Sequence, residues 1–222
     1  MKTTKRPKYS RILLKLSGEA LGGPTGLNIC AEAVAGMMGS AMNNTVKFLN
    51  VTGEEAGLLG SDAYAADAAT RGENIRGVIN YDMIAWAGDG IPATENLDLN
   101  YNAPSQWLAQ RFVDAAASYG TGLSVNPILC PSLTVSDHYP FWQRGWSAIC
   151  GITDNEGYCG AAGNYPYYHT ANDTIANNGN LAFFYKVVKT TVATLAELGE
   201  PFKVAFSAEG YACGAPIQVL LA

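Results

Sequence analysis

Two adjacent carboxylates, Glu54 and Glu55, follow directly on a short apolar segment of the chain. This segment, Val46–Val51, has the length and composition of a buried strand, and Thr52 and Gly53 end it. Neighbouring acids at the end of a buried strand are costly unless a positive group lies between them. Because ligands of open α/β sheets bind at the carboxyl ends of strands, the pair predicts a metal centre. A solvated turn with two surface acids is the alternative.

Three further residues of metal-binding type follow other strand candidates. Asp82 lies near the end of the apolar segment Ile75–Trp86, where it either binds a metal or caps a turn. The two histidines of the chain, His138 and His169, lie in polar, aromatic loops that follow strand candidates. Glu, Asp and His together suit zinc, and their wide spacing fits a site assembled from separate strand ends.

Composition limits the classes of function. The 222 residues are 48% hydrophobic and 15% charged, which is enough for one sizeable core. The net charge of −5, with no basic block after the first fifteen residues, argues against nucleic acid or anionic membrane as a partner. No apolar segment has membrane-spanning length, and Ile12–Leu14 is too short for the core of a signal peptide.

The five cysteines include no CxxC pair, which excludes a zinc ribbon. Cys150 and Cys159 flank a Gly-rich loop and are candidates for a disulfide, which would imply an oxidising compartment. The odd number leaves at least one thiol outside any disulfide within the chain.

Strand and helix patterns alternate, which predicts an α/β fold with a largely parallel sheet. Residues Gly88–Asn102 are expected to form a loop. The last helix should begin after Asn180, end at Gly199 and bury a stripe that includes Leu181. The expected strands are 46–51, 75–86, 123–129 and 146–150, and the expected helices are 31–42, 62–69, 105–119 (with Tyr119 on its apolar face) and 180–198.

Residues 8–23, KYSRILLKLSGEALGG, resemble the start of bacterial uridylate kinase, a member of the amino-acid kinase family. In that family a strand delivers a glycine-containing loop to nucleotide phosphates. The resemblance covers about the first thirty residues, and no GxxxxGK[ST] motif occurs. We interpret residues 1–30 as a foreign N-terminal segment, natural or produced by faulty sequence assembly.

Four motifs in order resemble the co-catalytic zinc aminopeptidases, a family that includes bacterial leucyl aminopeptidase and aminopeptidase S. They are FLNVTGEEAGLLGSDAY, INYDMI, SDHYPFWQRGWSAI and YYHTANDT, and the similarity covers about residues 31–198. The resemblance implies a three-layer α/β/α sandwich with a central mixed, mostly parallel sheet. It also implies two zinc ions and hydrolysis of N-terminal peptide bonds of peptides or proteins.

The resemblance assigns roles to individual residues. Glu54 is expected as the general base, Glu55 and His169 as ligands of one zinc, and Asp82 as a ligand of the other. Asp137 and His138 match a motif near the site without being ligands. The candidates for a substrate pocket, for which plain loop packing is the alternative, are Asp137, His138, Tyr139, Phe141, Trp142 and Tyr168.

One departure from the family affects both metals. The family takes a first His and a metal-bridging Asp from segments upstream of the Glu pair, and residues 1–53 contain neither residue type. The acids there are Glu19 and Glu32. We therefore expect zero or one zinc, impaired activity and an N-terminally incomplete peptidase domain over residues 31–200, with a tail of unknown role over 201–222. A strand at Arg11–Leu16 is expected to cover the gap left in the sheet.

Two other functions remain open at this point: a non-catalytic binding domain with a peptidase fold, and a nucleotide-binding kinase fragment. Location is also divided. The family resemblance favours a secreted or periplasmic protein, whereas the lack of a recognisable signal peptide leaves the cytoplasm open.

Overall fold

The structure is a computed structural model that describes residues 11–15, 44–86, 96–153, 158–160 and 165–199. Its strands are β1 (Arg11–Lys15), β2 (Thr45–Leu49), β3 (Ile75–Asp82), β4 (Leu97–Tyr101), β5 (Val125–Leu129) and β6 (Ala148–Ile152). Its helices are α2 (Leu59–Thr70), η1 (Ala103–Ser105), α3 (Gln106–Ser118), α4 (Tyr139–Trp142), η2 (Tyr158–Gly160), α5 (Ile175–Asn178) and α6 (Leu181–Leu198). No described helix is both long enough and apolar enough to cross a membrane.

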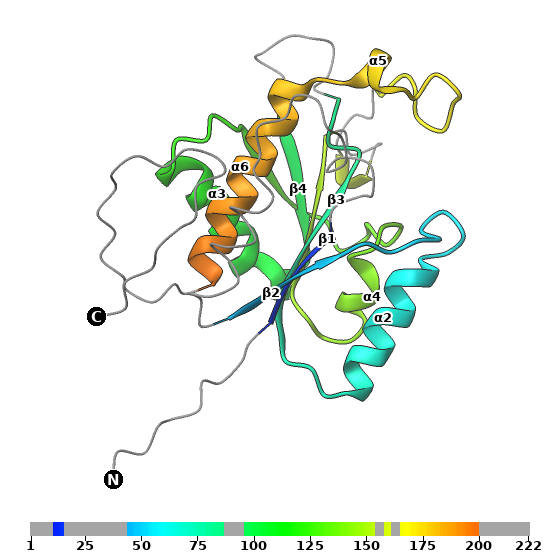
Figure 1. Cartoon of the computed structure of the whole chain (residues 1–222), viewed down its shortest axis with the longest axis vertical. Helices are drawn as coiled ribbons and strands as arrows, with labels where there is room; N and C mark the ends of the chain where they lie inside the picture. The colour runs from blue at the N-terminus through cyan, green and yellow to red at the C-terminus, as the bar shows by residue number, and fades with distance from the viewer. Residues whose placement is uncertain (1–10, 16–43, 87–95, 154–157, 161–164, 200–222) are drawn as a thin grey trace, which may run out of the picture.

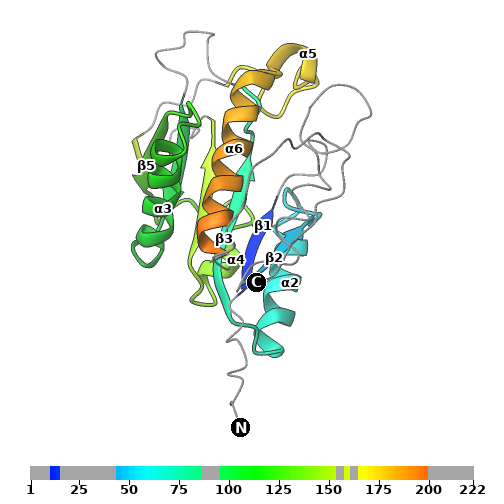
Figure 2. The same ribbon diagram turned by 60° about the vertical axis from the view of Figure 1, so that its left-hand side comes forward.

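The strands form one sheet in the order β2-β1-β3-β6-β4-β5. The β4–β6 ladder is antiparallel and the other four are parallel, so the sheet is mixed and mostly parallel, as predicted. Helices α3 and α6 cover one face of the sheet, and α2 and α4 cover the other (Figure 1; Figure 2 shows α6 lying along the sheet). The fold is therefore the expected three-layer α/β/α sandwich.

Each face of the sheet has its own apolar core. On the α3 and α6 side, Phe112 and Phe183 are fully buried against β3 and β4 residues such as Leu99. On the α2 and α4 side, a smaller cluster packs Phe141 against Ala65. Because the sheet is covered on both faces, six of the eight residues of β3 are buried, Asp82 is half-buried and Arg76 is exposed.

The expected loop at Gly88–Asn102 is wrong in part, because β4 lies within it. Positions Leu97 to Asn100 are all buried, so the strand shows no contrast between an apolar and a solvated face. Its polar residues, which are uncommon in strands, find partners inside: Asn126 Nδ2 donates to Asp98 Oδ1 at 2.8 Å, and Asn100 Nδ2 donates to the Cys150 carbonyl at 3.5 Å.

The long C-terminal helix agrees with its prediction at both ends. The Asn180 side chain accepts a hydrogen bond from Phe183 N at 2.9 Å, which is the predicted N-cap, and Gly199 follows the last turn. The apolar stripe was wrong at Leu181, which is 51% exposed because it lies in the first turn, beyond the core. The expectation that Tyr119 packs inward from α3 was also wrong, since this residue follows the helix and is 54% exposed.

Strand β1 pairs in parallel with both β2 and β3, so it occupies an interior position between them. Over Arg11–Lys15 the expected strand is thus part of the sheet, and Leu16 lies outside the described residues. Several other expectations lie outside the described residues: the glycine loop at 16–23, the helix at 31–42, Cys30 and Cys213, and the tail at 201–222.

Candidate metal centre

The loop that carries Glu54 and Glu55 is folded back onto the start of α2. The Glu54 carbonyl accepts hydrogen bonds from Gly57 N at 3.0 Å and Leu58 N at 2.9 Å. The Thr52 carbonyl accepts one from Gly60 N, also at 3.0 Å. A Cβ added at Gly60 would lie 2.5 Å from that carbonyl oxygen, so glycine is required for this close approach. The turn thereby sets the backbone of both glutamates beyond the end of β2.

Asp82 is the last residue of β3 and lies opposite Ile152, the last residue of β6. Met83 follows with a left-handed backbone, φ +49°, and its carbonyl accepts hydrogen bonds from the amide and the hydroxyl of Thr153. The two parallel strands are thus tied together where they end. Because β2, β1, β3 and β6 run in parallel, Asp82 belongs to the same edge of the sheet as the Glu54–Glu55 loop.

His169 reaches this edge from the segment that follows β6. Its Nε2 lies 2.9 Å from Glu55 Oε1, a contact between residues 114 positions apart. Both side chains are exposed, His169 at 55% and Glu55 at 74%. The Tyr168 ring stacks on the imidazole, with centroids 3.9 Å apart and planes inclined by 20°. Of the four residues assigned to the metal centre, the structure brings Glu55 and His169 into direct contact.

The Glu55–His169 pair fits one zinc ion as two of its ligands. Zinc bonds of about 2.0–2.2 Å in tetrahedral geometry separate a nitrogen and an oxygen ligand by about 3.3 Å, so a small shift opens the observed contact enough. A catalytic zinc needs about three protein ligands. Among the described residues, however, no group of three or more His, Cys, Asp and Glu side chains could hold a metal ion. The described residues therefore do not fit a two-zinc centre.

The SDHYPFW segment lies mostly inside the protein. Asp137 and His138 are buried at 2% and 0% exposure, and the imidazole packs edge-on to Trp142. His138 Nε2 lies 2.9 Å from the Leu133 carbonyl, so this histidine makes a hydrogen bond nearby. Phe141 packs in the core beneath α2, and Tyr139 is half-buried. Tyr168, which is 40% exposed, is the exposed aromatic residue beside the contact between Glu55 and His169.

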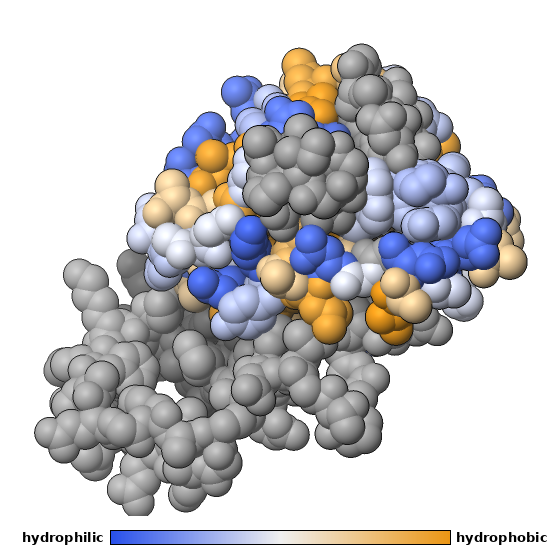
Figure 3. Space-filling model, turned by 90° about the horizontal axis from the view of Figure 1, so that it is seen from above, coloured by the Kyte–Doolittle hydropathy of each residue, from blue (hydrophilic) through white to orange (hydrophobic). Residues whose placement is uncertain are grey.

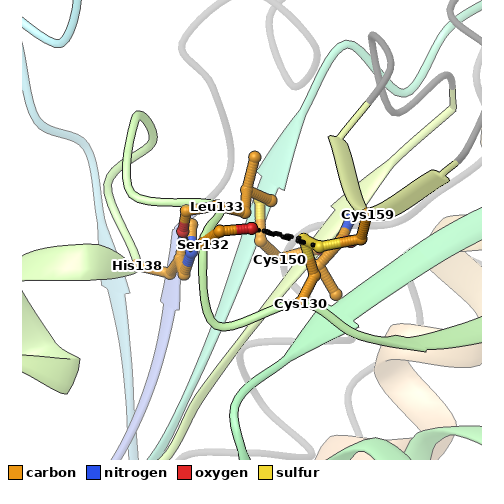
Figure 4. Close-up of a disulfide and its surroundings, with 7 residues drawn as sticks. Cys130, Ser132, Leu133, His138, Cys150 and Cys159 are labelled. Atoms are coloured by element: carbon orange, nitrogen blue, oxygen red, sulfur yellow. Dashed lines mark hydrogen bonds between the residues drawn. A yellow bond between two sulfur atoms is a disulfide. The ribbon is translucent and has the colours of Figure 1, made fainter.

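The predicted Cys150–Cys159 disulfide is wrong. Cys159 forms its disulfide with Cys130, at a Cα–Cα distance of 5.6 Å, and Ser132 Oγ lies 3.3 Å from Cys159 Sγ (Figure 4). Cys150 is a buried thiol whose sulfur accepts a hydrogen bond from Asn80 Nδ2 at 3.3 Å. The bridge ties the end of β5 to η2, which precedes the His169 segment in the chain. Sequence spacing favoured the nearer pair, whereas the fold brings the more distant pair together.

Two residues of the His169 segment that the sequence did not single out are in contact. Tyr165 Oη donates a hydrogen bond to Asp173 Oδ1, so the side chains four residues before and after His169 meet. The sequence signals this contact only weakly, through the equal spacing of Tyr165 and Asp173 on either side of His169. Seen from above, the described surface of the molecule mixes hydrophilic and hydrophobic residues (Figure 3).

The chain is similar in sequence to known peptidases. The sequence model of peptidase family M28 matches residues 25–193. A probable zinc metalloprotease of Phaeosphaeria nodorum is 28% identical over 140 residues, covering 51% of this chain and 28% of that protein.

Solved structures show the same fold. Legionella pneumophila LapA superposes with a TM-score of 0.65 at 18% identity, covering 86% of this chain and 53% of LapA. BSAP, a zinc aminopeptidase from Bacillus subtilis, gives a TM-score of 0.61 at 20% identity, covering 93% of this chain and 50% of BSAP. The chain spans about half the length of these two proteins. Because the family model matches well over half of the sequence, the chain belongs to peptidase family M28.

Proposed function

We propose that this chain is a zinc-dependent metallopeptidase domain of the aminopeptidase type whose hydrolytic activity is impaired by a shortage of metal ligands. The observation that carries the proposal is the 2.9 Å contact between Glu55 Oε1 and His169 Nε2. A nitrogen and an oxygen ligand from distant parts of the chain meet there, at the sheet edge where a metal is expected. Membership of a peptidase family supports peptides as the substrate class.

The proposed roles are those that the resemblance to the co-catalytic zinc aminopeptidases implies. Glu55 and His169 are the ligands of one zinc, and Glu54, the neighbour of Glu55, is the general base that takes a proton from the attacking water. Asp82 is the residue that remains at the second metal position of the family, where we propose that no second zinc binds. The chemistry that zinc supplies in such a site is activation of water and polarisation of the scissile carbonyl. Tyr168 is the best-placed residue for contact with an N-terminal side chain, because it is exposed beside His169.

We propose that zero or one zinc binds, and one zinc only weakly. Residues 1–53 provide no His and no Asp, and the described residues contain no cluster of three ligands. Two protein ligands leave half of a tetrahedral shell to water, which lowers affinity relative to sites with three or four.

Zinc titration of the metal-stripped protein by calorimetry tests this proposal. One weak equivalent in the wild type, lost in Glu55→Ala and in His169→Ala, is the expected result. Glu197→Ala, which removes an acid on α6, is the matched control and should bind as the wild type does. Two tight equivalents would show that other residues complete the centre and that the impairment does not exist.

A non-catalytic peptide-binding domain is the second candidate, and the absence of a three-ligand group among the described residues favours it. Aminopeptidase assays in excess zinc separate the two functions: slow release of N-terminal residues supports the first, and peptide binding without release supports the second. A nucleotide-binding role predicts a higher melting temperature with ATP or UMP, and an unchanged temperature rules it out.

We also propose an oxidising location, secreted or periplasmic, for this protein. The Cys130–Cys159 bridge supports it, because disulfides persist mainly outside the cytosol. Recovery of the protein with this pair oxidised from the culture medium or the periplasm is the expected result, and a reduced pair in cytosolic protein would contradict it.

A further inference from the structure

His169 is held in a backbone conformation that needs support from its neighbours. Its φ of +55° lies in the left-handed region, which residues other than glycine adopt uncommonly and keep only where the surrounding structure enforces it. Burial does not supply that support, because the side chain is 55% exposed. Specific contacts, made by the histidine itself and by its flanking residues, must therefore supply the support.

A side-chain hydrogen bond closes the segment around His169. Tyr165 Oη donates to Asp173 Oδ1, and these two residues lie four positions before and four positions after the histidine. The main chain between them folds in successive turns: Thr170 N donates to the Tyr167 carbonyl at 3.0 Å, and Asp173 N donates to the Thr170 carbonyl at 3.1 Å. The result is a closed loop with His169 at its centre.

This closed loop is attached to the sheet through Tyr165. Tyr165 is 7% exposed, and its ring packs on Trp86 with centroids 5.2 Å apart. Trp86 lies four residues beyond Asp82, at the end of β3. Its tilted ring contact therefore connects the loop that carries His169 to the strand that carries Asp82.

We propose that the Tyr165–Asp173 hydrogen bond is a positioning element that holds His169 Nε2 against Glu55. Tyr165 provides the fixed point, since it is buried against Trp86, and Asp173 draws the far end of the loop back to it. The inference rests on the proposed function only for its effect on zinc affinity, because the His169–Glu55 contact exists in the chain without metal.

The variants that test this role change one group at a time. Tyr165→Phe removes the hydroxyl and keeps the ring on Trp86, and Asp173→Ala removes the acceptor. Asp173→Asn keeps an acceptor oxygen and is the expected rescue. Tyr167→Phe is the matched control. It removes a hydroxyl group from the same loop, but this hydroxyl makes no hydrogen bond among the described residues, and the ring contact with Tyr165 is kept.

The first measurement is imidazole NMR of the metal-stripped protein, in which two histidines give two sets of signals. Stacking on Tyr168 shifts the His169 ring protons upfield, and His138, buried against Leu133, is an internal reference. In Tyr165→Phe and Asp173→Ala the His169 signals should move toward random-coil positions while the His138 signals stay. Unchanged His169 signals in both variants would overturn the proposal, and so would loss of both sets, which would indicate general unfolding.

The second measurement is the zinc affinity of the same variants. Loss of groups that orient a metal ligand typically lowers affinity by about 10–100-fold, so Tyr165→Phe and Asp173→Ala should fall in that range, with Asp173→Asn and Tyr167→Phe within about threefold of wild type. If wild type binds no zinc, zinc-dependent hydrolysis by this chain is ruled out, while the NMR result still decides the positioning role. If wild type binds zinc and the variants bind it equally well, the positioning role fails alone.

Discussion

Removing the Cys130–Cys159 disulfide should lower the free energy of unfolding by about 3.6 kcal/mol. The bridge closes a loop with a sequence separation of 29, and the chain-entropy relation for a loop of that length gives this value at 25 °C. For a chain of this size the loss corresponds to a decrease in melting temperature of roughly 7–14 °C. The variant that tests it is Cys130→Ala combined with Cys159→Ala.

Cys150→Ala is the matched control for this change. Cys150 and Cys130 are both fully buried in the same apolar cluster, so each truncation leaves a similar small cavity, but the Cys150 change breaks no bridge. The control should lose about 1 kcal/mol, the usual cost of a modest core change.

Urea unfolding at neutral pH measures all three proteins, and peptide mapping without reductant identifies the paired cysteines. A double variant no less stable than Cys150→Ala would show that the bridge does not stabilise the chain. A mapped peptide that joins Cys150 to Cys159 would refute the pairing itself.

Three further results should follow from other parts of the structure. Burial raises the pKa of Tyr81 well above its usual value, so this tyrosine ionises first in the unfolded chain, and the free energy of unfolding should fall as pH rises past about 10. Urea unfolding from pH 8 to 11 should show a smaller fall for Tyr81→Phe than for wild type. Equal falls would contradict the raised pKa of Tyr81. Phe112→Ala should lower the free energy of unfolding by about 3–5 kcal/mol, because the Phe112 ring is fully buried. Phe48 is 48% exposed, so Phe48→Ala should cost much less. Similar losses in the two variants would show that the core is misplaced. Gly60→Ala should displace the loop that carries the carboxylate pair, because the added Cβ meets the Thr52 carbonyl at 2.5 Å, and zinc titration should show weaker binding; unchanged affinity would show that this loop does not set the site.

Much of the candidate site follows from the sequence because its residues lie where strands end. An apolar segment that is followed by two glutamates, and another that has Asp82 near its end, indicate the carboxyl edge of a sheet without any knowledge of strand order. The shortage of ligands is also visible in the sequence, since residues 1–53 contain neither His nor Asp. The cap of α6 at Asn180 was predictable for the same reason: it depends on contacts between near neighbours.

The tertiary structure decided what depends on distant parts of the chain. Strand β4 could not be recognised from its own residues, because Asp98 and Asn100 suit a strand only once Asn126 and the Cys150 carbonyl provide partners. The disulfide joined Cys159 to Cys130 because the end of β5 lies beside η2, a proximity that sequence spacing does not encode. The contact of His169 with Glu55 and the loop closed by Tyr165 and Asp173 likewise arise only in the folded chain. The sequence alone determined which residue types lie at the ends of the strands, because local pattern sets those ends, and only the folded sheet decided which of them meet.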